Sequence, residues 1–139
     1  MADFVIDCSP VLAWFFDDEI SDYSEAVLRH LESRAPAIAP RLWQLELTNG
    51  LVVGERRRRS GLTAPESFLR FIQALNVSFD DSIPEVAVLL DVAREHRLSV
   101  YDSVYLTLAI RESLPIATLD KQLAQAAEAS GVGLWSPSS

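Results

Sequence analysis

The sequence predicts an α/β fold, a three-layer α/β/α sandwich built around a mostly parallel central sheet. Short apolar runs alternate with longer segments of helical periodicity along the whole chain, which is typical of parallel strands joined by helices. Hydrophobic residues make up 49% of the chain and charged residues 23%, the balance of an ordinary globular domain. No repeat, low-complexity stretch or linker divides the 139 residues. We therefore expect one domain over residues 1–135, followed by a short frayed tail over 136–139.

The predicted strands are short apolar runs of the kind found in a sheet that is covered on both faces. Each is bounded by turn-forming or helix-starting residues, as where an aspartate and a serine-proline pair follow the first run. In chain order, the five predicted strands cover residues 3–6, 37–39, 77–78, 116–118 and 132–134.

Seven helices are predicted between the strands, at 10–16, 21–33, 42–59, 64–75, 83–96, 101–113 and 121–130. Ser9 and Pro10 form an N-cap followed by proline at the first helical position. Residues 63–66 and 82–85 both have the pattern of a capping box. Gly61, after the arginine-rich segment, is expected to end the third helix.

Composition excludes several classes of protein. The net charge of −8 argues against a basic nucleic-acid-binding protein, but not against a nuclease whose site carboxylates are part of the acidic count. The apolar runs are far shorter than the ~18 residues of a membrane span, and the start lacks the basic region of a secretory signal. With only Cys8, His30 and His96 available, neither a disulfide nor a Cys/His zinc site is expected. We expect a cytoplasmic protein.

Four acidic residues stand at the ends of, or inside, apolar segments: Asp7, Glu46, Asp102 and Asp120. Carboxylates are rarely buried unless they are paired, because removing an unpaired one from water costs several kcal/mol. Lysine and arginine are scarce near all four in the sequence. A bound cation is therefore the natural counter-charge, and ligation by oxygen alone favours Mg²⁺ or Mn²⁺.

Each acid also has a purely structural interpretation. Asp7 and Asp120 can begin the helices that follow them, and Asp102 can form a capping box with Ser99. Glu46 can face solvent on an amphipathic helix. Taken together, however, Asp7 and Asp120 fall at the carboxyl ends of predicted strands, where open α/β sheets bind ligands. We expect all four acids to meet at one edge of the sheet.

Four segments, in order along the chain, resemble PIN-domain ribonucleases, and most closely the VapC toxins of bacterial toxin–antitoxin pairs. They are residues 5–16 (VIDCSPVLAWFF), 45–51 (LELTNGL), 98–109 (LSVYDSVYLTLA) and 117–123 (ATLDKQL). Each segment contains one of the four acids. The resemblance covers most of the chain.

The resemblance implies a PIN-like fold and a metal-dependent endoribonuclease, with Asp7, Glu46, Asp102 and Asp120 as the catalytic and metal-binding residues. The expected cofactor is Mg²⁺, with Mn²⁺ as a substitute. The implied products carry a 5′-phosphate and a 3′-hydroxyl. The expected partners are an RNA substrate, a VapB-like antitoxin and a second copy of the chain. Some relatives carry another acid after the last aspartate, where Lys121 and Gln122 stand here, so the number of bound ions is open.

Other residues near these segments have two interpretations each. Ser9 and Thr118 either orient water at the metal or simply cap helices. The block Arg56, Arg57, Arg58, Arg59 either docks RNA phosphates or complements the dipole at a helix C-terminus. The aromatic residues at 14–16 either stack on bases or belong to the core or to an antitoxin-binding groove.

Two alternative functions stay open. The chain could be a PIN-like binding module without catalytic activity. It could also be another Mg²⁺-dependent α/β protein, such as an aspartyl-phosphate phosphatase or a receiver domain. The phosphatase pattern requires an aspartate where Ser9 stands, and a receiver requires a lysine at the end of a late strand, whereas Lys121 begins a helix.

Overall fold

The computed structural model describes residues 1–33 and 35–137. Within them, a four-stranded sheet has the order β3-β2-β1-β4, and every neighbouring pair of strands is parallel. The strands are β1 (Phe4–Ile6), β2 (Ala37–Pro40), β3 (Val77–Asp80) and β4 (Ile116–Ala117). The predicted fold class is confirmed, and the sheet is parallel throughout.

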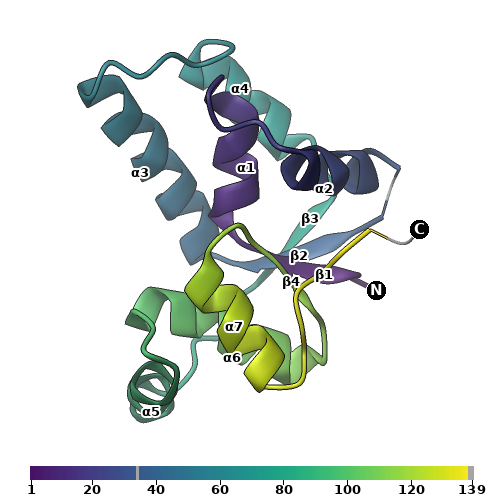
Figure 1. The fold of residues 1–139 in the computed structure, drawn as a ribbon, viewed down its shortest axis with the longest axis vertical. Helices are drawn as coiled ribbons and strands as arrows, with labels where there is room; N and C mark the ends of the chain where they lie inside the picture. Colours follow the sequence, from purple (N-terminus) through teal and green to yellow (C-terminus); the bar gives the residue numbers. More distant parts are fainter. Residues whose placement is uncertain (34, 138–139) are drawn as a thin grey trace.

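Helices cover both faces of this sheet (Figure 1). Figure 1 shows α1, α2, α3 and α4 on one side of the strands and α5, α6 and α7 on the other. The seven helices of the described chain are α1 (Cys8–Phe15), α2 (Asp22–Glu32), α3 (Leu42–Arg56), α4 (Pro65–Gln73), α5 (Val86–His96), α6 (Val100–Glu112) and α7 (Lys121–Ala129). None of the described helices is long and apolar enough to cross a membrane.

The core lies between these layers and explains why β1 is continuously apolar. Phe4, Val5 and Ile6 are all fully buried, because β1 is a central strand with helices on both faces. On the face of the sheet opposite α1, helix α6 contributes Tyr105 and Leu106 to the core, and both are also fully buried. The buried strand ends at Asp7, which places a carboxylate at the carboxyl edge of the sheet.

Side-chain contacts between α1 and α3 determine the direction of the Glu46 side chain. Cys8 and Leu12 on α1 face Glu46 and Gly50 on α3, and a Cβ on Gly50 would lie 2.7 Å from Cδ1 of Leu12. Successive residues four apart lie on one face of a helix, so this glycine face also carries Glu46. The close helix contact therefore directs Glu46 toward the N-terminus of α1.

The predicted strand at 132–134 is wrong. Leu134 forms a single parallel bridge with Ile116, and no longer pairing extends from it within the described residues. The reason is local, because Gly131 and Gly133 both have positive φ and turn the chain on either side of Val132. Of the predicted frayed tail at 136–139, residues 138 and 139 lie outside the described part of the chain.

Three predicted helix starts are also wrong. Helix α1 begins one residue after Asp7, and Ser9 donates to the Asp7 carboxylate instead of capping the helix. Helices α4 and α5 begin at Pro65 and Val86. Their expected capping boxes at 63–66 and 82–85 do not form, because the N-caps are Ala64 and Glu85 rather than Thr63 and Ser82, and neither N-cap side chain caps its helix.

Helix α3 ends at Arg56, before the predicted glycine stop. Arg58 adopts a left-handed conformation (φ 54°), and the backbone N–H of Arg59 donates to the carbonyl of Gly54. This closes the helix as glycine commonly would. The arginine block therefore turns away from the helix axis, and its four side chains do not share one helical face.

Candidate active site

A cavity of about 640 Å³ opens at the carboxyl edge of the sheet. All four acids singled out in the sequence line it. Its walls come from the end of β1, from α1 and α3, from the start of α6 and from the start of α7. The lining residues are Asp7, Cys8, Ser9, Leu12, Leu42, Leu45, Glu46, Asn49, Gly50, Tyr101, Asp102 and Asp120, with no lysine, arginine or histidine among them.

Asp7 is the most buried of these acids, with 7% of its surface exposed. Its backbone N–H donates to the carbonyl of Ala117, which extends the pairing of β1 with β4. Its Oδ2 accepts two hydrogen bonds of 2.8 Å, from the hydroxyls of Ser9 and Thr118. The carboxylate is thereby fixed in orientation.

Ser9 and Thr118 also hold the segment that follows β4. The Ser9 hydroxyl oxygen accepts from the N–H of Leu119 at 2.8 Å, and that of Thr118 accepts from the N–H of Asp120 at 3.0 Å. Each hydroxyl has one hydrogen, which it donates to Asp7. The two residues thus tie the orientation of Asp7 to the backbone position of Asp120.

Asp102 and Asp120 have helix-start roles as well as positions in the cavity. The hydroxyl of Ser99 accepts from the N–H of Asp102 at 3.0 Å. Asp120 is the N-cap of α7, where its Oδ1 accepts from the N–H groups of Gln122 and Leu123 at 2.8 and 3.1 Å. Asp120 thus caps α7 with its own carboxylate while lining the cavity, whereas at the start of α6 the cap is Ser99 and Asp102 takes part through its backbone N–H.

The pKa values of two of the acids are raised, first by burial and then by the neighbouring negative charges. Burial raises the pKa of Asp102 to about 6, and repulsion from Asp7, Asp120 and Glu46 acts in the same direction. Burial also raises the pKa of Glu46, with a further contribution from Asp7. A bound cation would relieve this repulsion.

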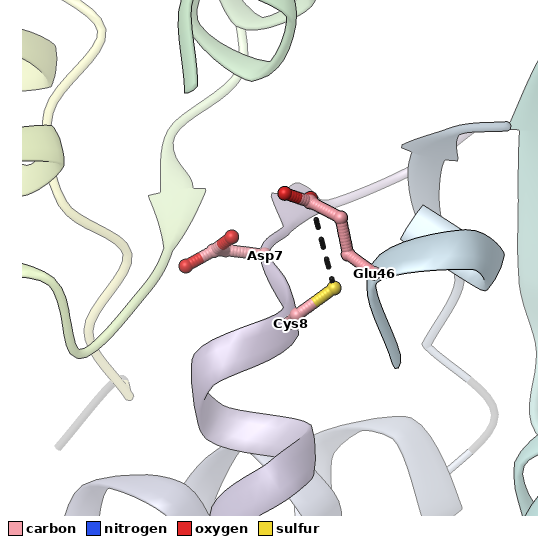
Figure 2. A group of neighbouring side chains, drawn as sticks. All are labelled: Asp7, Cys8 and Glu46. Atoms are coloured by element: carbon pink, nitrogen blue, oxygen red, sulfur yellow. Dashed lines mark hydrogen bonds between the residues drawn. The ribbon is translucent and has the colours of Figure 1, made fainter. Parts of the chain in front are cut away.

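Asp7, Cys8 and Glu46 form the tightest group of possible metal ligands, with one ligand atom from each within 4.8 Å of the others (Figure 2). Cys8 is nevertheless a poor ligand here. Burial and the Asp7 charge raise the pKa of its thiol far above the usual value, so it stays protonated. Its sulfur lies 3.4 Å from the carbonyl of Trp43, to which it donates. The donor set that fits a cation is thus carboxylate oxygen, which suits a hard divalent ion.

Two residues that contact Glu46 were not predicted as site residues: Cys8, which lines the cavity, and Tyr105, which is buried behind the lining. Cys8 lies 3.9 Å from Oε1 of Glu46, and the hydroxyl of Tyr105 donates to the same oxygen at 2.6 Å. Both stand in apolar runs beside an acid, where sequence patterns indicate only core packing. The one sequence feature that could have indicated a role for Tyr105 at the site is its position one helical turn after Asp102.

The arginine block divides into different environments. Arg57 and Arg59 line a second cavity of about 500 Å³, which shares Ser9, Leu12, Asn49, Gly50 and Asp120 with the acidic one. Arg59 is held by ion pairs with Asp18 and Glu19, and its guanidinium lies 3.9 Å from the ring centroid of Phe16. Arg56 and Arg58 are exposed.

The aromatic residues at 14–16 are all buried, which excludes base stacking by them in this structure. The indole N–H of Trp14 donates to the carbonyl of Ser24 at 2.6 Å. Phe15 and Phe16 contact each other edge to face. The core interpretation of this cluster is confirmed.

A parallel α/β sheet with a carboxylate-lined cavity at its carboxyl edge is the architecture that these observations define. The family model of the PIN domain matches residues 4–129. The chain belongs to the PIN domain family.

Two proteins of Pyrobaculum aerophilum are similar to this chain. The curated protein Ribonuclease VapC3 is 29% identical over 128 residues, which cover 87% of this chain and 92% of that protein. The crystal structure of PAE2754 superposes with a TM-score of 0.68 at 20% sequence identity, covering 90% of this chain and 84% of the other. At that identity, the second comparison shows a shared fold.

Proposed function

We propose that this protein is a metal-dependent endoribonuclease that hydrolyses RNA phosphodiester bonds as a VapC-type toxin. One observation carries the proposal: four carboxylates from separate segments line a single cavity that no basic residue lines. Membership of the PIN domain family supports it, as does the similarity to a protein named as a ribonuclease.

The cavity fits Mg²⁺ or Mn²⁺, with Asp7, Glu46, Asp102 and Asp120 as the residues that would hold the ion. The oxygens of Asp7 and Glu46 lie within 4.8 Å of one another, close enough to bind one cation together. When bound, such an ion supplies activation of water, neutralisation of the scissile phosphate and stabilisation of the leaving oxygen.

The protein's own contribution is to hold the carboxylates ready. Ser9 and Thr118 fix the orientation of Asp7 through two hydroxyl donors. Asp120 is fixed from the other direction, because two N–H groups of α7 occupy its Oδ1. This preorganisation means that little rearrangement is needed when the cation and the phosphate arrive.

No histidine base is required in this scheme. His30 bonds to the Asp3 carboxylate at 3.0 Å, and His96 lies 3.5 Å from the hydroxyl of Ser130. Neither histidine lines the cavity.

We infer that RNA approaches along the second cavity, which continues from the acidic one through Asn49 and Gly50. Arg57 lines that cavity and can contact a phosphate beside the scissile bond. Arg59, already paired with Asp18 and Glu19, is the less available of the two.

From the resemblance to VapC toxins, we also propose that the protein binds a VapB-like antitoxin, forms a homodimer and is located in the cytoplasm. We propose that residues 1–135 form one domain. An apolar cavity of about 280 Å³ beside the aromatic cluster is a candidate surface for the antitoxin. Its lining is Trp14, Phe15, Leu62, Thr63, Ser67, Phe68 and Phe71.

The test of the nuclease proposal is cleavage of a mixed pool of structured RNA with Mg²⁺ or with EDTA. We expect cleavage by the wild type with Mg²⁺ and its loss in Asp7→Asn, which keeps the shape of the side chain. Asp91→Asn is the matched control, because Asp91 is an exposed carboxylate on α5 and its removal should leave cleavage unchanged. Equal activity of the wild type and Asp7→Asn would contradict the assignment.

A further inference from the structure

Tyr105 is a buried polar residue that lies behind the cavity lining and contacts Glu46. It lies on α6, one turn after Asp102, and is 0% exposed. A buried phenol hydroxyl requires a partner. This one donates to Oε1 of Glu46 at 2.6 Å, a short bond of the kind formed with a charged acceptor.

Cys8 is the other side chain of the described protein that reaches Glu46, but its bond is weak. Its sulfur lies 3.9 Å from Oε1 of Glu46 and 3.6 Å from the Tyr105 hydroxyl. The single thiol hydrogen has a closer acceptor in the carbonyl of Trp43, at 3.4 Å. Tyr105 therefore supplies the strong hydrogen bond to the Glu46 carboxylate.

The bond also connects two layers of the fold. Glu46 belongs to α3 and Tyr105 to α6, and these helices lie on opposite sides of the sheet (Figure 1). Because α6 also carries Asp102, the hydroxyl sets the position of Glu46 relative to another acid of the same cavity. Figure 2 shows Glu46 extending from α3 toward Asp7, above Cys8.

We propose that Tyr105 is a positioning residue that occupies Oε1 of Glu46 and leaves the second carboxylate oxygen directed to the cation. The inference rests on the proposed function, since it concerns the same metal site. Removing the hydroxyl would free the Glu46 side chain to rotate, and the cation would then lose a preset ligand. Outer partners of metal ligands commonly change metal affinity by roughly 10–100-fold.

The test is Tyr105→Phe, which keeps the buried ring and removes one oxygen. Binding of Mn²⁺ to the RNA-free protein is measured by calorimetry. We expect roughly 10-fold weaker binding, and a matching increase in the Mg²⁺ concentration needed for half-maximal cleavage, with KM for RNA unchanged. Ser24→Ala is the control, because it removes a buried hydroxyl that donates to the carbonyl of Ser21 at 3.0 Å, away from the cavity lining. It should leave the Mn²⁺ affinity unchanged.

A double-mutant cycle separates positioning from general packing. In a Glu46→Ala background, which lacks the acceptor of the Tyr105 hydroxyl, Tyr105→Phe should cause no further loss of Mn²⁺ affinity, because the hydroxyl acts through the carboxylate. An equal loss in both backgrounds, or an unchanged affinity in Tyr105→Phe alone, would overturn the positioning role while leaving the metal site intact. Failure of the wild type to bind Mn²⁺ would overturn the metal site as well.

Discussion

The ring of Phe16 occupies the space that a side chain on Gly54 would need. A Cβ at that position would lie 2.5 Å from Cζ of Phe16, a distance that requires either the Phe16 ring or the backbone to shift. This contact lies at the opposite end of the α1–α3 interface from the contact between Cys8 and Glu46. The packing of α1 on α3 is therefore coupled to the position of a site carboxylate.

Gly54→Ala should destabilise the protein, even though alanine is the better helix former by about 0.5–1 kcal/mol. Overpacking against the Phe16 ring costs typically 1–3 kcal/mol, so we expect a net loss of about 1 kcal/mol in the free energy of unfolding. Urea denaturation measures it. Val52→Ala, on the exposed face of α3, should change stability by less than about 0.5 kcal/mol. A Gly54→Ala protein as stable as the wild type would show that the Phe16 ring or the helices can move aside at little cost.

Asp102 should make the metal-free protein less stable as the pH rises. The folded protein raises the pKa of this carboxyl from 3.8 to about 6, so it holds the proton more tightly than the unfolded chain does. The contribution of Asp102 to the free energy of unfolding then falls across that pH range and stays low above it. The difference between the two pKa values is equivalent to about 3 kcal/mol, and solvent screening of the half-exposed group reduces the expected effect to about 1 kcal/mol.

Thermal melting in EDTA at pH 4 and pH 7 measures this effect. We expect the melting temperature of Asp102→Asn, relative to the wild type, to be higher at pH 7 than at pH 4. Adding Mg²⁺ at pH 7 should stabilise the wild type more than the variant, because the cation removes the repulsion that the variant lacks. A pH-independent difference between the two proteins would contradict this electrostatic interpretation.

Much of the fold was predictable because most of the strands are short apolar runs bounded by recognisable turn or helix-start residues. The apolar segment of β1 stops at Asp7, and the N-cap of α7 is visible in Asp120. The end of a strand and the start of a helix depend on neighbouring residues, so they can be predicted from the sequence. The parallel sheet then brings both residues to one edge, as expected for carboxyl ends of neighbouring strands.

The errors have two sources: hydrogen-bond partners that are distant in the sequence, and local backbone conformations that the residue types did not indicate. Ser9 has the pattern of an N-cap, yet its hydroxyl donates to Asp7 and its oxygen accepts from Leu119, 110 residues away. Gly61 suggested a helix end, but Arg58 takes the left-handed conformation instead. Tyr105 was missed because an aromatic residue in an apolar helix is usually core, and only tertiary structure shows the hydroxyl bonding Glu46.

Arg57 should matter more for RNA binding than its neighbours in the arginine block. It lines the cavity that continues from the acidic site, whereas Arg56 lies outside its lining. In an Asp7→Asn background that prevents cleavage, we expect Arg57→Gln to weaken RNA binding several-fold. The slope of log affinity against log salt should fall by about 1. Arg56→Gln is the control of equal charge, and equal effects of the two substitutions would show that only net charge matters.

Thr118 should support both the stability of the protein and its affinity for metal. Thr118→Val keeps the side-chain shape but removes a donor to Asp7 and an acceptor for the N–H of Asp120. An unsatisfied buried partner costs about 1–3 kcal/mol, so unfolding by urea should occur at lower concentration. Mn²⁺ affinity should fall as well, because Asp7 keeps only the Ser9 hydroxyl as an orienting donor. Thr118→Ser retains the hydroxyl and should recover most of the metal affinity. If Thr118→Ser binds Mn²⁺ as weakly as Thr118→Val, the hydroxyl alone does not hold Asp7 in place.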